Sequence, residues 1–447
     1  MRNLTEIRRV LRHREFRFLW LAQSSSVIGD YLVVVALALF VIQRTGSPTD
    51  LGLVLAAQAL PLVVLLLVGG VWADRLPRHR VMMATDVVRF ALHGLLAVLI
   101  FTDVVAIWQL VVIEALFGSA EAFFRPAAEG VLPQTVPERD IQQARAITSM
   151  SNNVAEFGGP VLATVLVLGA GAGWAFAIDA LTFLASAAFL SRVRPRRRGS
   201  SEAPPASGAA APASVWGEIR DGLREVRSRP WVWATLLSFC AALFFGLAPW
   251  FVLGPIVAEH QYGHLAVYGF LEAAIGLGTV VGAVLAVGWR PRRPMRAAML
   301  AIMAWPVAAI LYASGVPLGL VLPMTLLGGV GIAVFDVLWT TALAERIPPG
   351  SLSRVSSFDW MISGALLPLG YAFAGPLASA LGAVPVMLGG AALALLAFAL
   401  GLLPAQTRSL ERLTPGDTAA AAEQTAALAA RADAAPADAR LPHGTPR

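Results

Sequence analysis

The chain has 447 residues, of which 57% are hydrophobic and 14% are charged, whereas an ordinary soluble domain is about half apolar and about a quarter charged. Its formal net charge is +6, and every one of the 34 Lys and Arg residues is an arginine. Apolar runs of about 20 residues recur from end to end, each long enough to cross the bilayer as a helix. This pattern excludes a soluble enzyme or a nucleic-acid-binding domain as the first interpretation and predicts a lipid-embedded protein.

The first half of the chain is predicted to contain six transmembrane helices. The basic segment 1–17 precedes an apolar run that contains Asp30 and has no small-residue cleavage site, so we expect a retained first helix rather than a removed signal peptide. Residues 1–191 are predicted to form an N-terminal six-helix bundle. The spans are 18–42, 51–73, 81–101, 107–131, 146–168 and 174–190.

A polar segment separates the two halves. Residues 192–229 combine an arginine cluster with a Pro, Ala, Ser and Gly run, which cannot bury enough apolar surface to fold, and we interpret them as a cytoplasmic linker. A second bundle is predicted over 230–404, and an Ala-rich tail, 405–447, is expected to be disordered in the cytosol. The spans of the second half are 231–257, 265–289, 297–313, 318–343, 355–381 and 384–403.

The arginines predict the orientation of the helices. With the N-terminus inside the cell, 31 of the 34 basic residues fall at the cytoplasmic side, and the loops expected outside carry only Arg44. Because basic residues near short loops stay in the cytoplasm, both termini are predicted to be cytoplasmic. The Ala-, Arg- and Pro-rich composition without lysine indicates a GC-rich bacterial genome, so we expect a multi-pass protein of the bacterial inner membrane.

An internal repeat relates the two halves. The segment 116–137 aligns with 327–348 at an offset of 211 residues, with Gly118 matching Gly329 and Phe124 matching Phe335. Both copies fall on the fourth helix of their half and run into a cytoplasmic loop. Two parallel six-helix repeats around a central site are a known transporter plan.

The loop after the second predicted span carries a family resemblance. It reads Gly70-Val71-Trp72-Ala73-Asp74-Arg75-Leu76-Pro77-Arg78-His79-Arg80, which resembles the glycine, aspartate and basic-cluster signature of the major facilitator superfamily. The resemblance implies a cytoplasmic gate that includes Gly70, Asp74, Arg75 and Arg78. Gly70 is expected to let helices approach, and Asp74 to pair with a facing helix N-terminus or an arginine.

A second stretch resembles one branch of that superfamily, the enterobactin-exporter and macrolide-efflux branch. The residues are Ala122-Phe123-Phe124-Arg125-Pro126-Ala127 through Val136-Pro137, followed by Gln143-Ala144-Arg145-Ala146 and Gly158-Gly159-Pro160. The resemblance implies an all-α integral membrane fold of 12 transmembrane helices in two pseudo-symmetric six-helix bundles. It also implies that Gly159 and Pro160 form a helix-bend motif of proton-coupled exporters, although Ala163 and Thr164 stand where glycines are common.

Ionisable residues inside the predicted spans are functional candidates, because a charge near mid-membrane is costly. Asp30 lies near the middle of the first helix and could take up and release protons, or it could make a packing hydrogen bond. Glu114, Glu121 and Arg125 share one face of the fourth helix, which we expect to line the cavity, although Glu121 and Arg125 could instead form an i, i+4 ion pair. The candidates for proton coupling or the substrate cavity are Asp30, Glu114, Glu121, Glu156, Asp179 and Glu272.

Other charged residues are predicted to pair. Arg125 matches Asp336 in the repeat, and we predict that the two meet across the halves when the cytoplasmic side is closed. Asp359 is expected to meet Arg75 or Arg78 in the same gate. On the third helix, Asp86 and Arg89 are expected to form a structural pair, and His93 could titrate near pH 7 or simply be hydrogen-bonded.

The sequence therefore predicts a secondary transporter that exports a small molecule, such as a drug, siderophore or natural product, by alternating access and proton antiport. The alternatives are an importer of a small nutrient and a non-transporting sensor or scaffold. Gly-x-Ser-x-Gly, His-Glu-x-x-His and Gly-Lys-Ser/Thr motifs are absent from the sequence, so neither a hydrolase nor an ATP-driven pump is indicated. We expect no cofactor and no metal, a monomer, and protons and lipid as partners beside the substrate.

Overall fold

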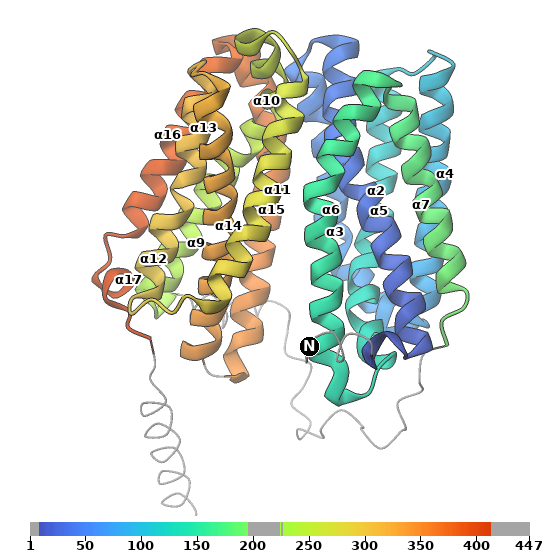
Figure 1. Cartoon of the computed structure of the whole chain (residues 1–447), viewed down its shortest axis with the longest axis horizontal. Coiled ribbons are helices and arrows are strands. Elements are labelled where there is room, and N and C mark those ends of the chain that lie inside the picture. The colour runs from blue at the N-terminus through green and yellow to red at the C-terminus, as the bar shows by residue number, and fades with distance from the viewer. Residues whose placement is uncertain (1–8, 195–223, 225–226, 348, 413–447) are drawn as a thin grey trace, which may run out of the picture.

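The structure is a computed structural model that describes residues 9–194, 224, 227–347 and 349–412, apart from the side chains at 67, 71, 73, 74, 287 and 349–363. Every regular element among these residues is a helix. Figure 1 shows the helices gathered into two bundles, one from each half of the chain. The chain is therefore all-α, as the sequence predicts.

The N-terminal bundle contains six long helices, drawn from blue to green in Figure 1. Each corresponds to one predicted span. The helix of the fourth span has the predicted bounds, and the others extend a few residues beyond theirs at one or both ends, since helix ends continue into the interfacial region beyond the apolar core. The helices are α2 (Arg14–Thr45), α3 (Pro48–Arg75), α4 (Arg78–Phe101), α5 (Ile107–Val131), α6 (Ile141–Gly169) and α7 (Ala172–Leu190).

In the C-terminal bundle two of the six spans are interrupted. The seventh span joins α9 (Pro230–Ala242), the π-helical turn η3 (Leu243–Leu247) and α10 (Ala248–Tyr262), and the ninth joins α12 (Pro294–Ile302) and α13 (Ala304–Ala313). Pro249 and Pro306 follow the two breaks and lack the N–H that a continuous helix requires. The other elements are α11 (Ala266–Gly288), α14 (Leu318–Arg346), α15 (Pro349–Leu381), α16 (Ala383–Gly401) and the short α17 (Ala405–Ser409).

Eleven helices of the described residues are long and apolar enough to cross a membrane. The one predicted span whose helix is not among them is the fifth, 146–168: its helix α6 is long enough but too polar in its N-terminal half. It packs against α2 of its own bundle and α11 of the other bundle. A helix between the two bundles has less contact with lipid, which explains how it can carry these polar residues: Gln142, Gln143, Arg145, Ser149, Ser151, Asn152, Asn153 and Glu156.

The internal repeat has a physical basis in helix packing. A Cβ atom at Gly118 of α5 would lie 1.9 Å from the carbonyl oxygen of Gln58 in α3, and one at Gly329 of α14 would lie 2.2 Å from that of Ile275 in α11. Both matched glycines thus let the fourth helix of their half touch the second helix of the same half. The weak sequence identity between the halves preserves this contact.

The bundles touch each other through α3 with α15 and α6 with α11. At the end where α3 begins, the hydroxyls of Thr49 and Ser379 are 3.0 Å apart, and a Cβ at Gly52 would lie 2.4 Å from the carbonyl oxygen of Tyr371. At the opposite end, where α2 begins, the ribbons of the two bundles diverge (Figure 1). The bundles are therefore tightly joined near the start of α3.

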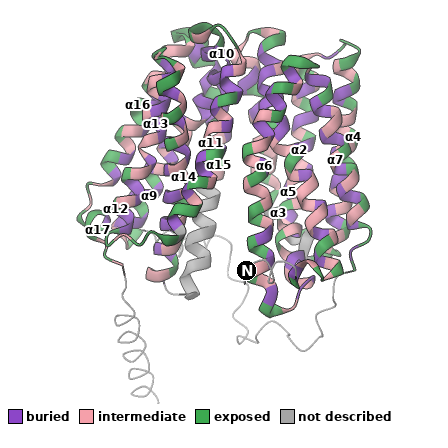
Figure 2. Ribbon diagram, viewed as in Figure 1, coloured by how far each residue is buried: buried purple, intermediate pink, exposed green. Residues whose placement is uncertain are grey.

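The outer faces of the bundles expose apolar side chains. In Figure 2 exposed residues follow the outward sides of both bundles. Large examples, each at least half exposed, come from four different helices: Val98, Leu181, Leu320 and Leu396. An apolar surface of this kind is expected of a protein whose solvent is lipid.

The start of the predicted disordered tail is ordered, which corrects the sequence interpretation for residues 405–412. Thr407 of α17 is buried, the backbone N–H of Arg412 donates to the carbonyl of Arg292 at 3.1 Å, and the guanidinium of Arg412 lies 3.7 Å from Glu345. These contacts hold the segment against the end of the C-terminal bundle. The remainder of the tail, 413–447, and most of the linker lie outside the described residues.

Candidate functional site

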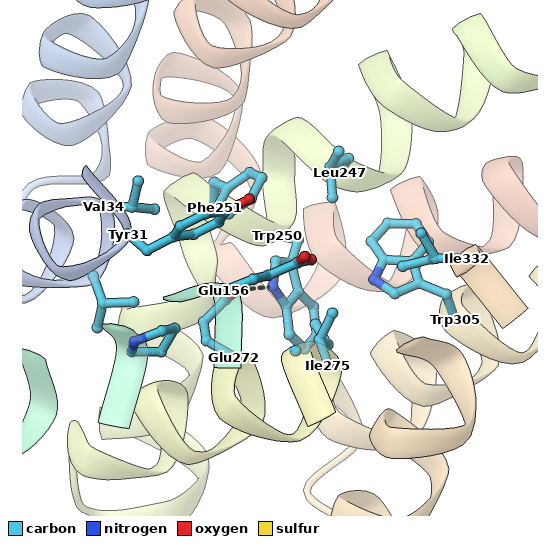
Figure 3. Close-up of a pocket in the computed structure, with 13 residues that line it drawn as sticks. Tyr31, Val34, Glu156, Leu247, Trp250, Phe251, Glu272, Ile275, Trp305 and Ile332 are labelled. Carbon is cyan, nitrogen blue, oxygen red and sulfur yellow. Dashed lines mark hydrogen bonds between the residues drawn. The ribbon is translucent and has the colours of Figure 1, made fainter. Parts of the chain in front are cut away.

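A cavity of about 260 Å³ lies between the two bundles. Two carboxyl groups line it, Glu156 from α6 of the N-terminal bundle and Glu272 from α11 of the C-terminal bundle, and Figure 3 shows them among aromatic side chains. Its other lining residues are Tyr31, Val34, Val35, Pro160, Leu247, Trp250, Phe251, Ile275, Gly276, Trp305 and Ile332. Two of the predicted candidates, one from each half, thus lie at this cavity, and their role in transport stays a prediction.

The walls of the cavity are acidic and aromatic. The indole N–H of Trp250 donates to Glu272 Oε1 at 2.6 Å, drawn as a dashed line in Figure 3. The rings of Tyr31, Phe251 and Trp305 complete an aromatic wall, and none of the lining residues is an arginine, lysine or histidine. The cavity therefore presents two carboxyl groups, and none of its lining residues is a basic side chain that could balance their charge.

The predicted helix-bend motif lies beside this cavity. A Cβ at Gly159 would lie 2.6 Å from Cβ of Tyr31 and 2.9 Å from its carbonyl carbon, so the glycine lets α6 touch α2 at that point. Pro160 lines the cavity and is accommodated inside α6, which continues unbroken to Gly169. The motif thus brings the cavity-lining stretches of α2 and α6 together.

A second group of polar residues is buried inside the N-terminal bundle. Arg89 of α4 donates to Asp86 Oδ1 at 2.7 Å, which confirms the predicted pair, and the other oxygen of Asp86 accepts from Ser186 of α7 at 2.6 Å. Asp30 of α2 lies 3.9 Å from the same guanidinium. The ring centroid of Phe124 lies 4.1 Å from the guanidinium carbon of Arg89, a cation–π contact.

His93 lies one helical turn further along α4 and contacts two more carboxyl groups. Its Nδ1 forms a short hydrogen bond with Asp179 of α7, and its Nε2 lies 3.6 Å from Glu114 of α5. The ring stacks on Phe117 at 4.1 Å between centroids. Neither oxygen of Glu114 has a hydrogen-bond partner among the described residues, so the 3.6 Å approach of His93 is its main polar contact.

These six residues form what we call the acid cluster: Asp30, Asp86, Arg89, His93, Glu114 and Asp179. Four carboxyl groups face one permanent positive charge and one histidine, so full ionisation would leave two buried negative charges uncompensated even with His93 protonated. Buried charge without a partner is costly. The Asp30 side chain is 35% exposed, whereas the other five are at most 1% exposed, so Asp30 is the member most accessible from outside the bundle.

The six predicted cavity residues thus lie in three places: two line the cavity, three belong to the acid cluster, and Glu121 forms an ion pair on α5. Glu114 and Asp179 lie in the acid cluster rather than in the cavity, because His93 attracts them into the interior of the N-terminal bundle. Glu121 accepts two hydrogen bonds from Arg125, at 2.8 and 2.6 Å, which is the ion pair that the sequence left open.

The predicted gate is only partly described. Arg78 donates to the carbonyl of Gly130 at 2.7 Å, Arg75 is exposed, and Asp336 lies at an exposed position of α14. A Cβ at Gly70 would meet nothing within 4 Å, whereas one at Gly69 would lie 2.2 Å from the carbonyl of Ala122, so the close helix approach expected at Gly70 occurs one residue earlier. The side chains of Asp74 and Asp359 lie outside the described residues, and the gate pairs stay predictions.

Sequence reasoning gave little weight to His93, which the structure places at the centre of three helices. A signal was available, since Asp86, Arg89 and His93 follow at i, i+3 and i+7 and therefore share one face of α4. The aromatic wall of the cavity was not predicted as a set, because its members come from three separate helices of both halves, α2, α10 and α13.

Comparison with known proteins now defines the family. Residues 9–434 match the family described as transmembrane secretion effector, within the major facilitator superfamily. The chain belongs to this family. The predicted superfamily and fold are thereby confirmed.

Three relatives illustrate the similarity. A transporter of Bacillus subtilis, YfiS, described as an uncharacterised major facilitator protein, is 32% identical over 225 residues, which cover 50% of this chain and 52% of that protein. Macrolide efflux protein A of Streptococcus pyogenes is 21% identical and aligns over 80% of this chain and 87% of its own length. The enterobactin exporter EntS of Shigella flexneri is 27% identical over 77% of this chain and 80% of its own.

Solved structures agree on the fold. A bacterial homologue of the human lysosomal transporter Spinster, in an inward-facing conformation, has a TM-score of 0.69 at 16% identity and covers 90% of this chain and 99% of its own. The nucleoside transporter NupG has a TM-score of 0.65 at 13% identity and covers 88% of this chain and 98% of its own. Transporters of different cargo thus share this architecture.

Proposed function

We propose that the chain exports a small molecule in exchange for protons by alternating access. The observation that carries the proposal is the acid cluster, in which buried carboxyl groups outnumber positive charges and Asp30 is the accessible member. Such a cluster reaches electrical neutrality by holding protons. A group that must bind and release protons during each cycle needs this kind of site.

The link from the cluster to the cavity runs through α2. Asp30 faces Arg89 at 3.9 Å, and the next residue, Tyr31, lines the cavity and packs on Gly159. When Asp30 loses its proton, its charge is attracted to Arg89, and protonation removes that attraction. The protonation state of the cluster thereby acts on the helix that forms the cavity wall.

The direction of transport is supported by two observations. The arginine distribution predicts that the end where the bundles diverge faces the cytoplasm, so the cavity would load from inside. Two of the relatives are named as exporters of small molecules, a macrolide efflux protein and an enterobactin exporter. The first observation is the state in which an exporter loads, and the names of the relatives favour export, with substrate leaving the cell as protons enter.

The proposal is tested by accumulation of a panel of dyes and antibiotics in an efflux-deficient bacterium. We expect cells that express the wild type to accumulate less of at least one compound, and a protonophore to abolish the difference. Asp30→Asn should behave like empty vector at equal expression. The matched control is Asp103→Asn, because Asp103 is 79% exposed and lies far from the cluster in an exposed pair with Arg44.

Two outcomes would contradict the proposal. One is a wild-type effect that survives the protonophore, which would indicate another driving force. The other is full activity of Asp30→Asn, which would remove the acid cluster from the mechanism.

A further inference from the structure

The cavity between the bundles has features that specify its ligand more closely than the fold does. Its two charged residues, Glu156 and Glu272, are both acidic and come from opposite bundles. Since no basic side chain is among the lining residues, an anionic ligand would be repelled and a cation attracted. The charges therefore select the sign of the ligand.

The aromatic wall favours the same sign. Rings carry negative charge on their faces and attract cations, most strongly when the site excludes water. The ring centroids of Trp250 and Trp305 are 6.3 Å apart, with planes inclined by 63°, and Phe251 approaches Tyr371 edge-on at 6.2 Å. A rigid aromatic surface of this kind suits an apolar body attached to a positively charged group.

One polar atom of the wall has no partner. Trp305 is only 4% exposed, and its indole N–H has no hydrogen-bond partner among the described residues. Trp250, by comparison, donates its N–H to Glu272. A buried donor left unpaired is unfavourable, so a ligand that brings a hydrogen-bond acceptor to Trp305 would satisfy it.

From these three features we propose that the transported molecule is an organic cation with an aromatic or apolar body and a hydrogen-bond acceptor. This proposal rests on the proposed function, because it assigns the cavity to the substrate. Glu156 and Glu272 hold the cationic group between the two bundles. The rings of Tyr31, Trp250 and Phe251 enclose the body, and Trp305 donates to the acceptor.

Binding to purified protein tests the ligand class without requiring transport. The probes are radiolabelled benzoylcholine, which has a quaternary ammonium group, a phenyl ring and an ester carbonyl, and benzenesulfonate, an aromatic anion. We expect saturable binding of benzoylcholine and none of benzenesulfonate. Glu156→Gln and Glu272→Gln should each weaken benzoylcholine binding by about tenfold, as for the loss of one buried charge contact, and the double variant should abolish it.

The acceptor is tested separately with Trp305→Phe. This change should weaken benzoylcholine binding several-fold but leave benzyltrimethylammonium, which has no acceptor, unchanged. Glu129→Gln is the control, because Glu129 is 76% exposed and pairs with Arg145 outside the cavity. Equal binding of benzenesulfonate, or unchanged benzoylcholine binding in the double glutamine variant, would overturn the proposal.

The same experiment separates failure of this inference from failure of the proposed function. Suppose that the purified protein binds the cation through Glu156 and Glu272, while cells that express the protein show no proton-driven efflux. This result would support the ligand class and contradict the export mechanism. Proton-driven efflux that requires Asp30, limited to neutral or anionic compounds, would support the mechanism and overturn the ligand class.

Discussion

The two bundles share one architecture but differ in the chemistry of their interiors. The N-terminal bundle buries the acid cluster among phenylalanines, whereas the C-terminal bundle packs Trp250 against Tyr312 at 5.5 Å and Phe239 against Phe335 at 5.5 Å. Glu272 lies at the edge of that aromatic core, where its carboxyl group accepts a hydrogen bond from Trp250. The repeat therefore preserves helix packing while allowing the halves to specialise, with a charged interior in one and an aromatic interior in the other.

The largest loss of stability is expected when the N-terminal interior loses its permanent positive charge. Arg89→Ala would leave the buried Asp86 without its main partner, and breaking a buried pair in this way costs about 3–5 kcal/mol. We expect a strong decrease in folded protein, measured by size-exclusion chromatography and thermal unfolding in detergent. Arg44→Ala, which removes an exposed pair with Asp103, should cost about 0–1 kcal/mol. Equal stability of both variants would contradict a charge-based N-terminal interior.

The shared architecture predicts equal sensitivity at the two repeat glycines. Gly118→Val and Gly329→Val both place atoms against a carbonyl oxygen of a neighbouring helix, so each should lower the free energy of unfolding by about 1–3 kcal/mol. Gly70→Val, in open space, is the control. Thermal unfolding in detergent makes the comparison, and a large loss in one half alone would show that the halves do not share this contact.

The specialisation of the N-terminal half predicts a transport defect at His93. His93→Asn removes a group that can carry charge between Asp179 and Glu114, and we expect proton-driven efflux to fall by about tenfold, which corresponds to about 1.4 kcal/mol, with a changed dependence on pH. The control is His260→Asn in the C-terminal half, at an exposed position. A wild-type pH profile in His93→Asn would leave His93 a purely structural residue.

The smallest expected effect concerns the end of the N-terminal bundle. Burial disfavours the charge on Asp140, but the hydrogen bond with His13 and the charges of Arg9 and Arg139 outweigh it, so the pKa of Asp140 lies below its ordinary value. The interactions that lower this pKa therefore stabilise the contact of ionised Asp140 with His13 and Arg9 at neutral pH. The stabilisation is lost as the pH falls below the ordinary carboxyl pKa and through the lowered one.

A spin label at position 12, introduced with Cys240 replaced by Ala, reports that contact through its mobility. We expect mobility to rise only at acidic pH in the parent and to be high at all pH values in Asp140→Asn. No difference between the two at neutral pH would show that Asp140 does not hold the N-terminal segment.

Much of the fold could be predicted because each helix that crosses the lipid requires a run of about 20 apolar residues. Pro249 and Pro306 interrupt two of the helices but leave the positions of the spans as predicted. The division of the carboxyl groups could not be predicted, because it depends on contacts between helices far apart in the chain. Glu114 and Asp179 gave the same signal as Glu156 and Glu272, namely an acid in an apolar run. Only the approach of His93 separates the first pair from the cavity.

The central claim, that protons held by the acid cluster drive transport, is tested most directly in proteoliposomes with an imposed pH gradient and a compound that the cells exclude. The account predicts that wild type accumulates the compound in the acidic lumen against its concentration gradient and that Asp30→Asn only equilibrates it. Accumulation by Asp30→Asn at the wild-type level, or accumulation by wild type without a pH gradient, would contradict the account.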